Sequence, residues 1–78
     1  MAKSKTYTEE QLAALAKSFR EAAGKNRAEA AREIGVSRPV VFDAEEDPAK
    51  SLTKVRIRII EKYSAFKVTG PVFRLEKR

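Results

Sequence analysis

Several residue types on which catalysis and covalent cross-linking depend are missing from this sequence. It contains no cysteine and no histidine, so disulfides and thiol chemistry are excluded, and a zinc site would need carboxylates alone. The serines therefore have no histidine beside them to act as a base. Glycine is scarce and scattered, at positions 24, 35 and 70, so there is no glycine-rich phosphate-binding loop. We expect no enzyme, no metal site and no bound cofactor.

A long apolar segment is also missing. No run of apolar residues approaches the ~20 that a membrane-spanning helix needs. The first residues, MAKSKTYTEE, include lysines but no apolar stretch after them, so a secretory signal is not expected. At 78 residues the chain has room for one small domain with a single core. These absences favour a cytoplasmic protein without a membrane partner.

Charge is plentiful and unevenly distributed, with a formal net charge of +6. Residues 1–42 carry a balance of +3, residues 43–47 carry four acids and no base, and residues 48–78 carry a balance of +7. A basic protein suits a polyanionic partner, most often nucleic acid, although the same charge also serves solubility. The acidic run is predicted to be structural: Glu45 is expected to pair with a nearby base and Asp47 to introduce the turn at the following proline.

The N-terminal part of the chain is typical of a flexible basic arm followed by a helix. Residues 1–6 are the expected arm. Thr8 and Gln11 have the spacing of a capping box, and Gly24 is a helix stop, so we expect a first helix over residues 8–23. Its apolar stripe, at helical spacing, consists of Leu12, Leu15, Phe19 and Ala22.

Two shorter helices are expected next. Asn26 is a suitable N-cap for a helix over residues 27–34, which Gly35 ends because a left-handed conformation costs glycine little. A third helix should run over residues 38–46, with Ser37 as its cap and a tolerated proline in its first turn. Two helices joined by a short glycine-containing turn, with small inward residues, form a helix-turn-helix. The residues expected to build it are Ala30, Ala31, Ile34, Gly35, Val36, Val41 and Ala44.

Residues 51–63 carry two conflicting patterns. The strict alternation over residues 55–59 is typical of a strand. The length of the segment and the lack of a turn inside it favour a helix, with Ser51 as the expected cap. The helical stripe would consist of Leu52, Val55, Ile59, Ile60 and Tyr63.

The C-terminal tail changes to a two-residue apolar period, interrupted by Gly70-Pro71, which predicts two short strands or one bent strand. An isolated two-stranded ribbon is marginally stable in water. Its apolar face therefore needs cover, either from the helices of its own domain or from the same strand of a second subunit. The candidate dimerisation residues are Phe66, Val68, Val72, Phe73 and Leu75.

Together these segments predict a mainly α-helical fold. We expect a compact four- to five-helix bundle that contains a helix-turn-helix and ends in a short C-terminal β-strand or β-hairpin. The expected organisation is a basic arm (residues 1–6), a helix-turn-helix domain (residues 7–64) and a β extension (residues 65–78).

The segment 30-AAREIGVSRPVVFDAEEDPAKSLTKVRIRIIEKY-63 resembles the phage-repressor and Cro-type helix-turn-helix domains, also called XRE-like. That family typically has a Leu-Ala pair, then Leu-Gly-Val-Ser, an inward Ile or Val, a Glu, a proline turn and a further apolar helix. The matching positions here are Ala30-Ala31, Ile34-Gly35-Val36-Ser37, Val41, Glu45, Pro48 and Leu52. With the preceding helix, the resemblance covers residues 8–63.

The resemblance implies a transcriptional regulator that binds double-stranded operator DNA. Such proteins act as homodimers that place two recognition helices about one DNA turn (~34 Å) apart. The recognition helix here would be residues 38–46. The residues implied at base edges or in the groove are Ser37, Arg38, Pro39, Val40, Phe42 and Asp43. The residues implied at phosphates are Arg27, Lys50 and Lys54.

The outer face of the third helix departs from the family pattern. Family members carry polar residues there, whereas Pro39, Val40 and Phe42 are apolar and Asp43 is acidic. An apolar face can contact thymine methyl groups or a protein partner. The alternative hypothesis is therefore a protein-interaction module, antitoxin-like or adaptor-like, that keeps this fold with weak or no DNA binding. RNA binding by the basic tail lacks a supporting RNP-type aromatic motif.

Overall fold

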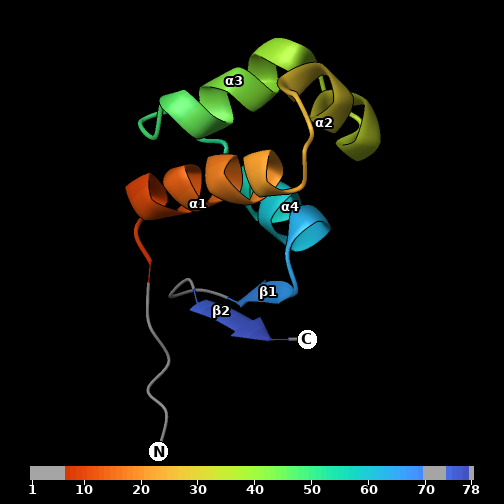
Figure 1. Cartoon of the computed structure of the whole chain (residues 1–78). Coiled ribbons are helices and arrows are strands. Elements are labelled where there is room, and N and C mark those ends of the chain that lie inside the picture. Colours follow the sequence, from red (N-terminus) through yellow and green to blue (C-terminus); the bar gives the residue numbers. More distant parts are fainter. Residues whose placement is uncertain (1–6, 70–73, 78) are drawn as a thin grey trace, which may run out of the picture.

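Four helices and a two-stranded antiparallel sheet make up the computed structural model, which describes residues 7–69 and 74–77 (Figure 1). The elements are α1 (Glu9–Ala22), α2 (Arg27–Ile34), α3 (Arg38–Glu46), α4 (Thr53–Tyr63), β1 (Phe66–Thr69) and β2 (Arg74–Lys77). The expected helical bundle with a helix-turn-helix and a C-terminal hairpin is confirmed. Within the described part of the chain, no helix is long and apolar enough to cross a membrane.

Local capping signals determine where α1 and α2 begin and where α2 ends. The Thr8 hydroxyl accepts from the Gln11 N–H at 3.2 Å, and the Gln11 side chain accepts from the Thr8 N–H at 2.9 Å. Asn26 and Glu29 form the same reciprocal arrangement at the start of α2. Gly35 then leaves the helix with a φ of 78°, a conformation that disfavours residues with a Cβ. The caps predicted at Thr8, Asn26 and Gly35 are confirmed.

The later helices begin without side-chain caps. Ser37 stands at the N-cap position of α3, but its hydroxyl makes no capping hydrogen bond. The N-cap position of α4 belongs to Leu52, so the prediction that Ser51 caps this helix is wrong. The reason is a tight turn before the helix, in which the Leu52 N–H donates to the Lys50 carbonyl at 2.8 Å. The helical interpretation of this segment is confirmed, and its strand alternative is wrong.

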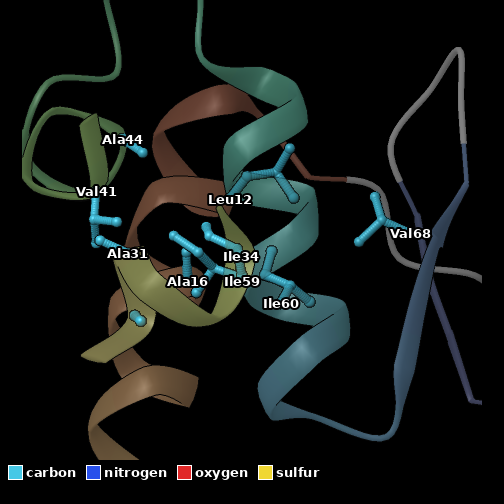
Figure 2. Packing of buried hydrophobic residues seen from close by; sticks show 10 residues of the cluster. Leu12, Ala16, Ala31, Ile34, Val41, Ala44, Ile59, Ile60 and Val68 are labelled. Carbon is cyan, nitrogen blue, oxygen red and sulfur yellow. The ribbon is translucent and has the colours of Figure 1, made fainter. Parts of the chain in front are cut away.

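All four helices and β1 contribute side chains to the hydrophobic core (Figure 2). Val41 and Ala44 of α3 are fully buried, as their spacing predicted. Small residues let the helices approach closely. The buried apolar cluster consists of Leu12, Ala16, Ala30, Ala31, Ile34, Val41, Ala44, Ile59, Ile60 and Val68.

Arg56 of α4 is fully buried in the bundle although it carries a charge. Its Nη1 donates to Glu9 Oε1 at 2.7 Å, and its Nε donates to the Ala44 carbonyl at 2.8 Å. Its Nη2 donates to the carbonyls of Asp47 and Lys50 at 2.8 and 3.0 Å. One guanidinium therefore joins the start of α1, the end of α3 and the loop before α4. The stripe expected for this helix did not include it.

The hairpin extends the core on the side of α4. Its paired residues are Phe66–Lys77, Lys67–Glu76, Val68–Leu75 and Thr69–Arg74. Val68 is only 8% exposed, and the ring centroid of Phe66 lies 6.0 Å from that of Phe19. The helices of the same chain thus cover part of the apolar face of the ribbon. Two of the predicted dimerisation residues, Val72 and Phe73, lie outside the described residues.

Replacing Arg56 by alanine is expected to lower the free energy of unfolding by about 3 kcal/mol. Three main-chain carbonyls and the Glu9 carboxylate lose a buried donor in this variant. Urea unfolding followed by circular dichroism measures the loss. Arg58→Ala is the matched control, because Arg58 lies exposed on the same helix, and its effect should stay within about 0.5 kcal/mol. Equal losses in the two variants would contradict the role assigned to Arg56.

Candidate nucleic-acid interface

The start of α3 is presented to solvent at one end of the molecule. Figure 1 shows α2 and α3 together at this end, with the sheet at the opposite end. Because the inner face of α3 is buried, its other face points outward. Ser37, Arg38 and Pro39 are exposed, and Val40 is half-buried. The residues predicted to enter a DNA groove therefore lie on one accessible surface.

Two adjoining depressions lie on this surface, and arginine side chains line both. The first, of about 400 Å³, is lined by Arg20, Asn26, Arg27, Ala28 and Arg38. The second, of about 510 Å³, is lined by Arg27, Arg38, Pro39, Phe42 and Asp43. Arg27 and Arg38 belong to both. A polar, cationic depression suited to an anion thus adjoins a more apolar one.

The Glu45 carboxylate is fully buried beneath this surface, between two arginines. Arg20 holds it through two hydrogen bonds, from Nε to Oε2 at 2.6 Å and from Nη2 to Oε1 at 3.0 Å. Arg27 adds a third from its Nε to Oε1 at 3.0 Å. The hydrogen bond to Glu45 raises the pKa of the Arg20 guanidinium. The prediction that Glu45 pairs with a base is confirmed.

The other acids of the run 43–47 are also occupied by partners. Glu46 pairs with Lys17 at 3.0 Å and with Arg27 at 2.6 Å. The hydrogen bond from Lys17 is the main cause that lowers the pKa of Glu46. Asp43 pairs with Lys50 at 3.0 Å. The Asp47 carboxylate accepts from the N–H of Ala49 at 3.2 Å, so this residue shapes the turn, as predicted.

Arg38 differs from these cations because it takes part in no ion pair among residues 7–69 and 74–77. It is exposed at the first position of α3 and lines both depressions. Its guanidinium donors therefore face solvent rather than a carboxylate of the chain. Among the predicted contact residues, Arg38 and Lys54 are the cations that take part in no ion pair with a described residue, and Arg38 is the one that lines the two depressions.

Phe42 projects from α3 into the second depression and is 48% exposed. The guanidinium carbon of Arg27 lies 4.8 Å from the centroid of its ring, within the range of a cation–π contact. The Arg27 side chain is only 26% exposed, because Glu45 and Glu46 also hold it. Arg27 therefore joins the two carboxylates to the Phe42 ring within the protein. The phosphate contact predicted for it would be a further role.

The predicted flanking lysines lie beyond α3. Lys50, in the loop before α4, has a side chain that is 53% exposed, and the hydrogen bond to Asp43 raises its pKa. Lys54 is exposed in the first turn of α4. Arg20, which lines the first depression, was not predicted. A signal for it exists in the sequence, because it follows Ala16 by four residues and continues the buried row of α1.

Comparison of the chain with models of protein families, with curated proteins and with solved structures gave no match.

Two carboxyl groups determine how we expect stability to change with pH. The hydrogen bond from Lys17 lowers the pKa of Glu46, and hydrogen bonds from Tyr63 and then Lys25 lower the pKa of Glu33. A carboxyl whose pKa is lower in the folded state contributes stability above its unfolded pKa and loses it as the pH falls through the folded value. The melting temperature should therefore fall as the pH drops below the ordinary glutamate value of 4.5.

Glu46→Gln separates this effect from general acid unfolding. The melting temperature of this variant should lie below that of the wild type at neutral pH, and the gap should narrow as the pH falls below 4.5. Thermal unfolding at a series of pH values measures the gap. Glu10→Gln, at an exposed position of α1, is the control and should show a smaller gap at neutral pH. A gap for Glu46→Gln that keeps its size in acid contradicts the assignment.

Proposed function

We propose that this protein is a transcriptional regulator that binds operator DNA sequence-specifically through α3, as a homodimer in the cytoplasm. The observation that carries the proposal is Arg38, an exposed arginine without an ion pair among the described residues, at the first position of an exposed helix. A guanidinium there suits the O6 and N7 atoms of guanine or a backbone phosphate. The resemblance to phage-repressor domains and the net charge of +6 support the same function.

The first depression supports a phosphate contact beside the groove. It lies at the N-terminus of α2, where the N–H groups of Arg27 and Ala28 have no intrahelical partner. The side chain of Asn26 is already engaged with Glu29, so these two amides remain as donors to an anion. Helix N-termini favour phosphates because the backbone dipoles add to the donor groups. Arg27 Nη1, which takes part in neither ion pair of that side chain, adds a further donor.

The second depression supports contact with an apolar part of a base. Pro39 and Phe42 line it beside Arg38. In the major groove the apolar feature of a base pair is the C5-methyl group of thymine. An arginine that selects guanine and an aromatic ring that contacts thymine would together read neighbouring base pairs.

The acidic run does not oppose this mode of binding. Asp43 is paired with Lys50, and Glu45 and Glu46 are paired with cations of α1 and α2. These close pairs reduce the negative potential that a DNA phosphate would meet at the end of α3. Lys50 and Lys54 then extend the cationic surface beyond α3, where they would contact phosphates on the far side of the groove. Affinity should therefore fall steeply with salt.

Arg38→Ala is expected to lower the affinity for duplex DNA about tenfold, because one charge-assisted base or phosphate contact is lost. Fluorescence anisotropy with duplexes selected from a random-sequence library measures this affinity. If Arg38 contacts a phosphate, the slope of log affinity against log salt should also decrease by about one. Arg58→Ala removes the same charge from α4, away from both depressions, and should change the affinity by less than about twofold. No binding of the wild type to any duplex at low salt would overturn the proposal.

The second candidate function is a protein-interaction module of the antitoxin or adaptor kind. One observation favours it: Phe42 is the large hydrophobic residue that stands exposed among the described residues. Exposed aromatic residues in a groove are frequent anchors of protein interfaces. In this case Phe42 would bind a protein partner, and replacing Arg38 would not change the affinity for DNA.

The two functions differ in what Phe42 contacts, and DNA that lacks the thymine methyl group tests this. If Phe42 contacts thymine, Phe42→Ala and replacement of the contacted thymine by deoxyuridine should each weaken binding severalfold. Their combination should weaken it no further, since both remove the same contact. Arg58→Ala, on α4 and away from both depressions, is the control and should combine additively with deoxyuridine. Two results together would favour the protein-interaction module. The effects of Phe42→Ala and of deoxyuridine on DNA affinity would add fully at every thymine, and Arg38→Ala would leave that affinity unchanged.

A further inference from the structure

The two edges of the sheet differ in how their backbone groups are satisfied. β1 lies against α4, and side chains close its outer edge: the Phe66 N–H donates to the Ser64 hydroxyl at 3.1 Å, and the Val68 N–H donates to Glu61 Oε2 at 2.9 Å. In the part of the chain that the structure describes, the sheet consists of β1 and β2, so no strand lies beside the outer edge of β2 (Figure 1). An unpaired strand edge is a template for another strand.

The hydrogen bond of Val68 also determines which groups of β2 face outward. Because the Val68 N–H points away from β2, Val68 and Leu75 form a non-hydrogen-bonded pair of the antiparallel ladder. Both members of such a pair direct their N–H and C=O groups away from each other. Leu75 therefore presents both backbone groups at the outer edge of β2, while Arg74 and Glu76 direct theirs towards β1.

We propose that the outer edge of β2 binds the same edge of a second copy of this chain, in an antiparallel register centred on Leu75. The two-fold axis passes between the Leu75 residues of the two copies. The N–H of each Leu75 donates to the C=O of the other, as in any hydrogen-bonded antiparallel pair. The two hairpins then form one four-stranded sheet, which is a more stable unit than an isolated two-stranded ribbon.

The charges of β2 select this register among those that the backbone allows. A residue whose backbone groups face outward must pair with another residue of this kind. If most of β2 is to stay paired, the two-fold axis can therefore lie only at Leu75, at Arg74 or at Glu76. An axis at Arg74 places two arginines opposite each other, and an axis at Glu76 places two glutamates opposite each other. Directly opposed like charges destabilise a sheet. The axis at Leu75 instead places each Arg74 opposite a Glu76, twice.

The same register produces complementary rows on both faces of the joined sheet. On the side of the core, Val68 and Leu75 of one copy meet Leu75 and Val68 of the other, and both residues already pack against the buried cluster. On the outer side the row runs through Lys67, Glu76, Arg74 and Thr69, with Glu76 from one copy next to Arg74 from the other. The apolar cores of the two copies would therefore become continuous.

This surface deepens the proposed function by identifying the dimer contact, and its use in operator recognition rests on that function. The paired edge is short, well below the ~1,600 Å² of a standard interface, so the free protein should associate only weakly. Two half-sites on one duplex would strengthen the association, because the second contact becomes intramolecular. Self-association is measured without DNA. A protein that does not self-associate would therefore overturn the dimer contact but would not change the outcome expected for Arg38→Ala.

Exchange of charges between two variants tests the register. Arg74→Glu alone places two acids opposite each other, and Glu76→Arg alone places two bases opposite each other, so each should lower the association constant about tenfold or more. An equimolar mixture of the two variants pairs acids with bases at both positions. It should restore association to about the wild-type level. Sedimentation equilibrium at low salt, on the full chain, measures all four samples.

Lys77→Glu is the control, because it changes the net charge as much as Arg74→Glu but meets no charged residue in this register. It should leave association unchanged within about threefold. The mixture also shows whether Glu76→Arg has unfolded the hairpin, since Glu76 lies opposite Lys67 in its own sheet. A hairpin unfolded by this substitution would not regain association on mixing. The proposal is overturned if the wild type is monomeric at about 1 mM, if Arg74→Glu associates as the wild type does, or if the mixture stays monomeric.

Discussion

The burial of one carboxylate between two arginines determines how the helices of this domain are arranged. Glu45 belongs to α3, whereas its partners Arg20 and Arg27 belong to α1 and α2. A buried carboxylate that lost these partners would destabilise the fold by about 3–5 kcal/mol. The helix α3 can therefore dock only where both guanidiniums reach Glu45. This contact places Arg38, at the other end of α3, beside the N-terminus of α2.

Buried charge also compensates for a small apolar core. Arg56 is the largest of the fully buried side chains, and several of the buried apolar residues are alanines. A chain of this length has little interior volume in which to bury large hydrophobic groups. The guanidinium fills that volume and donates to the Ala44 carbonyl, which lies in the last turn of α3, and to the carbonyls of Asp47 and Lys50 in the segment that follows. No buried side-chain polar atom of residues 7–69 and 74–77 lacks a partner.

The sequence is informative where the determinants are local. Thr8, Asn26 and Gly35 act on their immediate neighbours, and the helix ends that they predict are the ones observed. Arg20 and Arg56 were missed because their partners lie far along the chain: Glu45 follows Arg20 by 25 residues, and Glu9 precedes Arg56 by 47. Both occupy helical positions in line with apolar residues, yet burial of a charge depends on partners that spacing does not reveal.

In the candidate site, too, some features follow from local sequence and others depend on residues that are distant along the chain. The exposure of Arg38 and Phe42 follows from the inward direction of Val41 and Ala44, which the three-residue spacing indicated. The double use of Arg27, as a partner of two carboxylates and of the Phe42 ring, depends on how α2 meets α3 and has no signature in the sequence. The dimer contact proposed for Leu75 likewise depends on a tertiary contact. Side chains of α4 and of the turn after it accept hydrogen bonds from the N–H groups of β1, and this determines which groups of β2 face outward.

The contact between Arg27 and Phe42 has a consequence for the entropy of binding. A long side chain that is free in solution loses rotamer freedom when a ligand orders it, at a cost of about 0.5–1.5 kcal/mol. Arg27 is already held at its Nε and Nη2 by carboxylates, and its guanidinium in turn covers one side of the Phe42 ring. Much of this cost is therefore met during folding, and the surface is preorganised for whichever partner it receives.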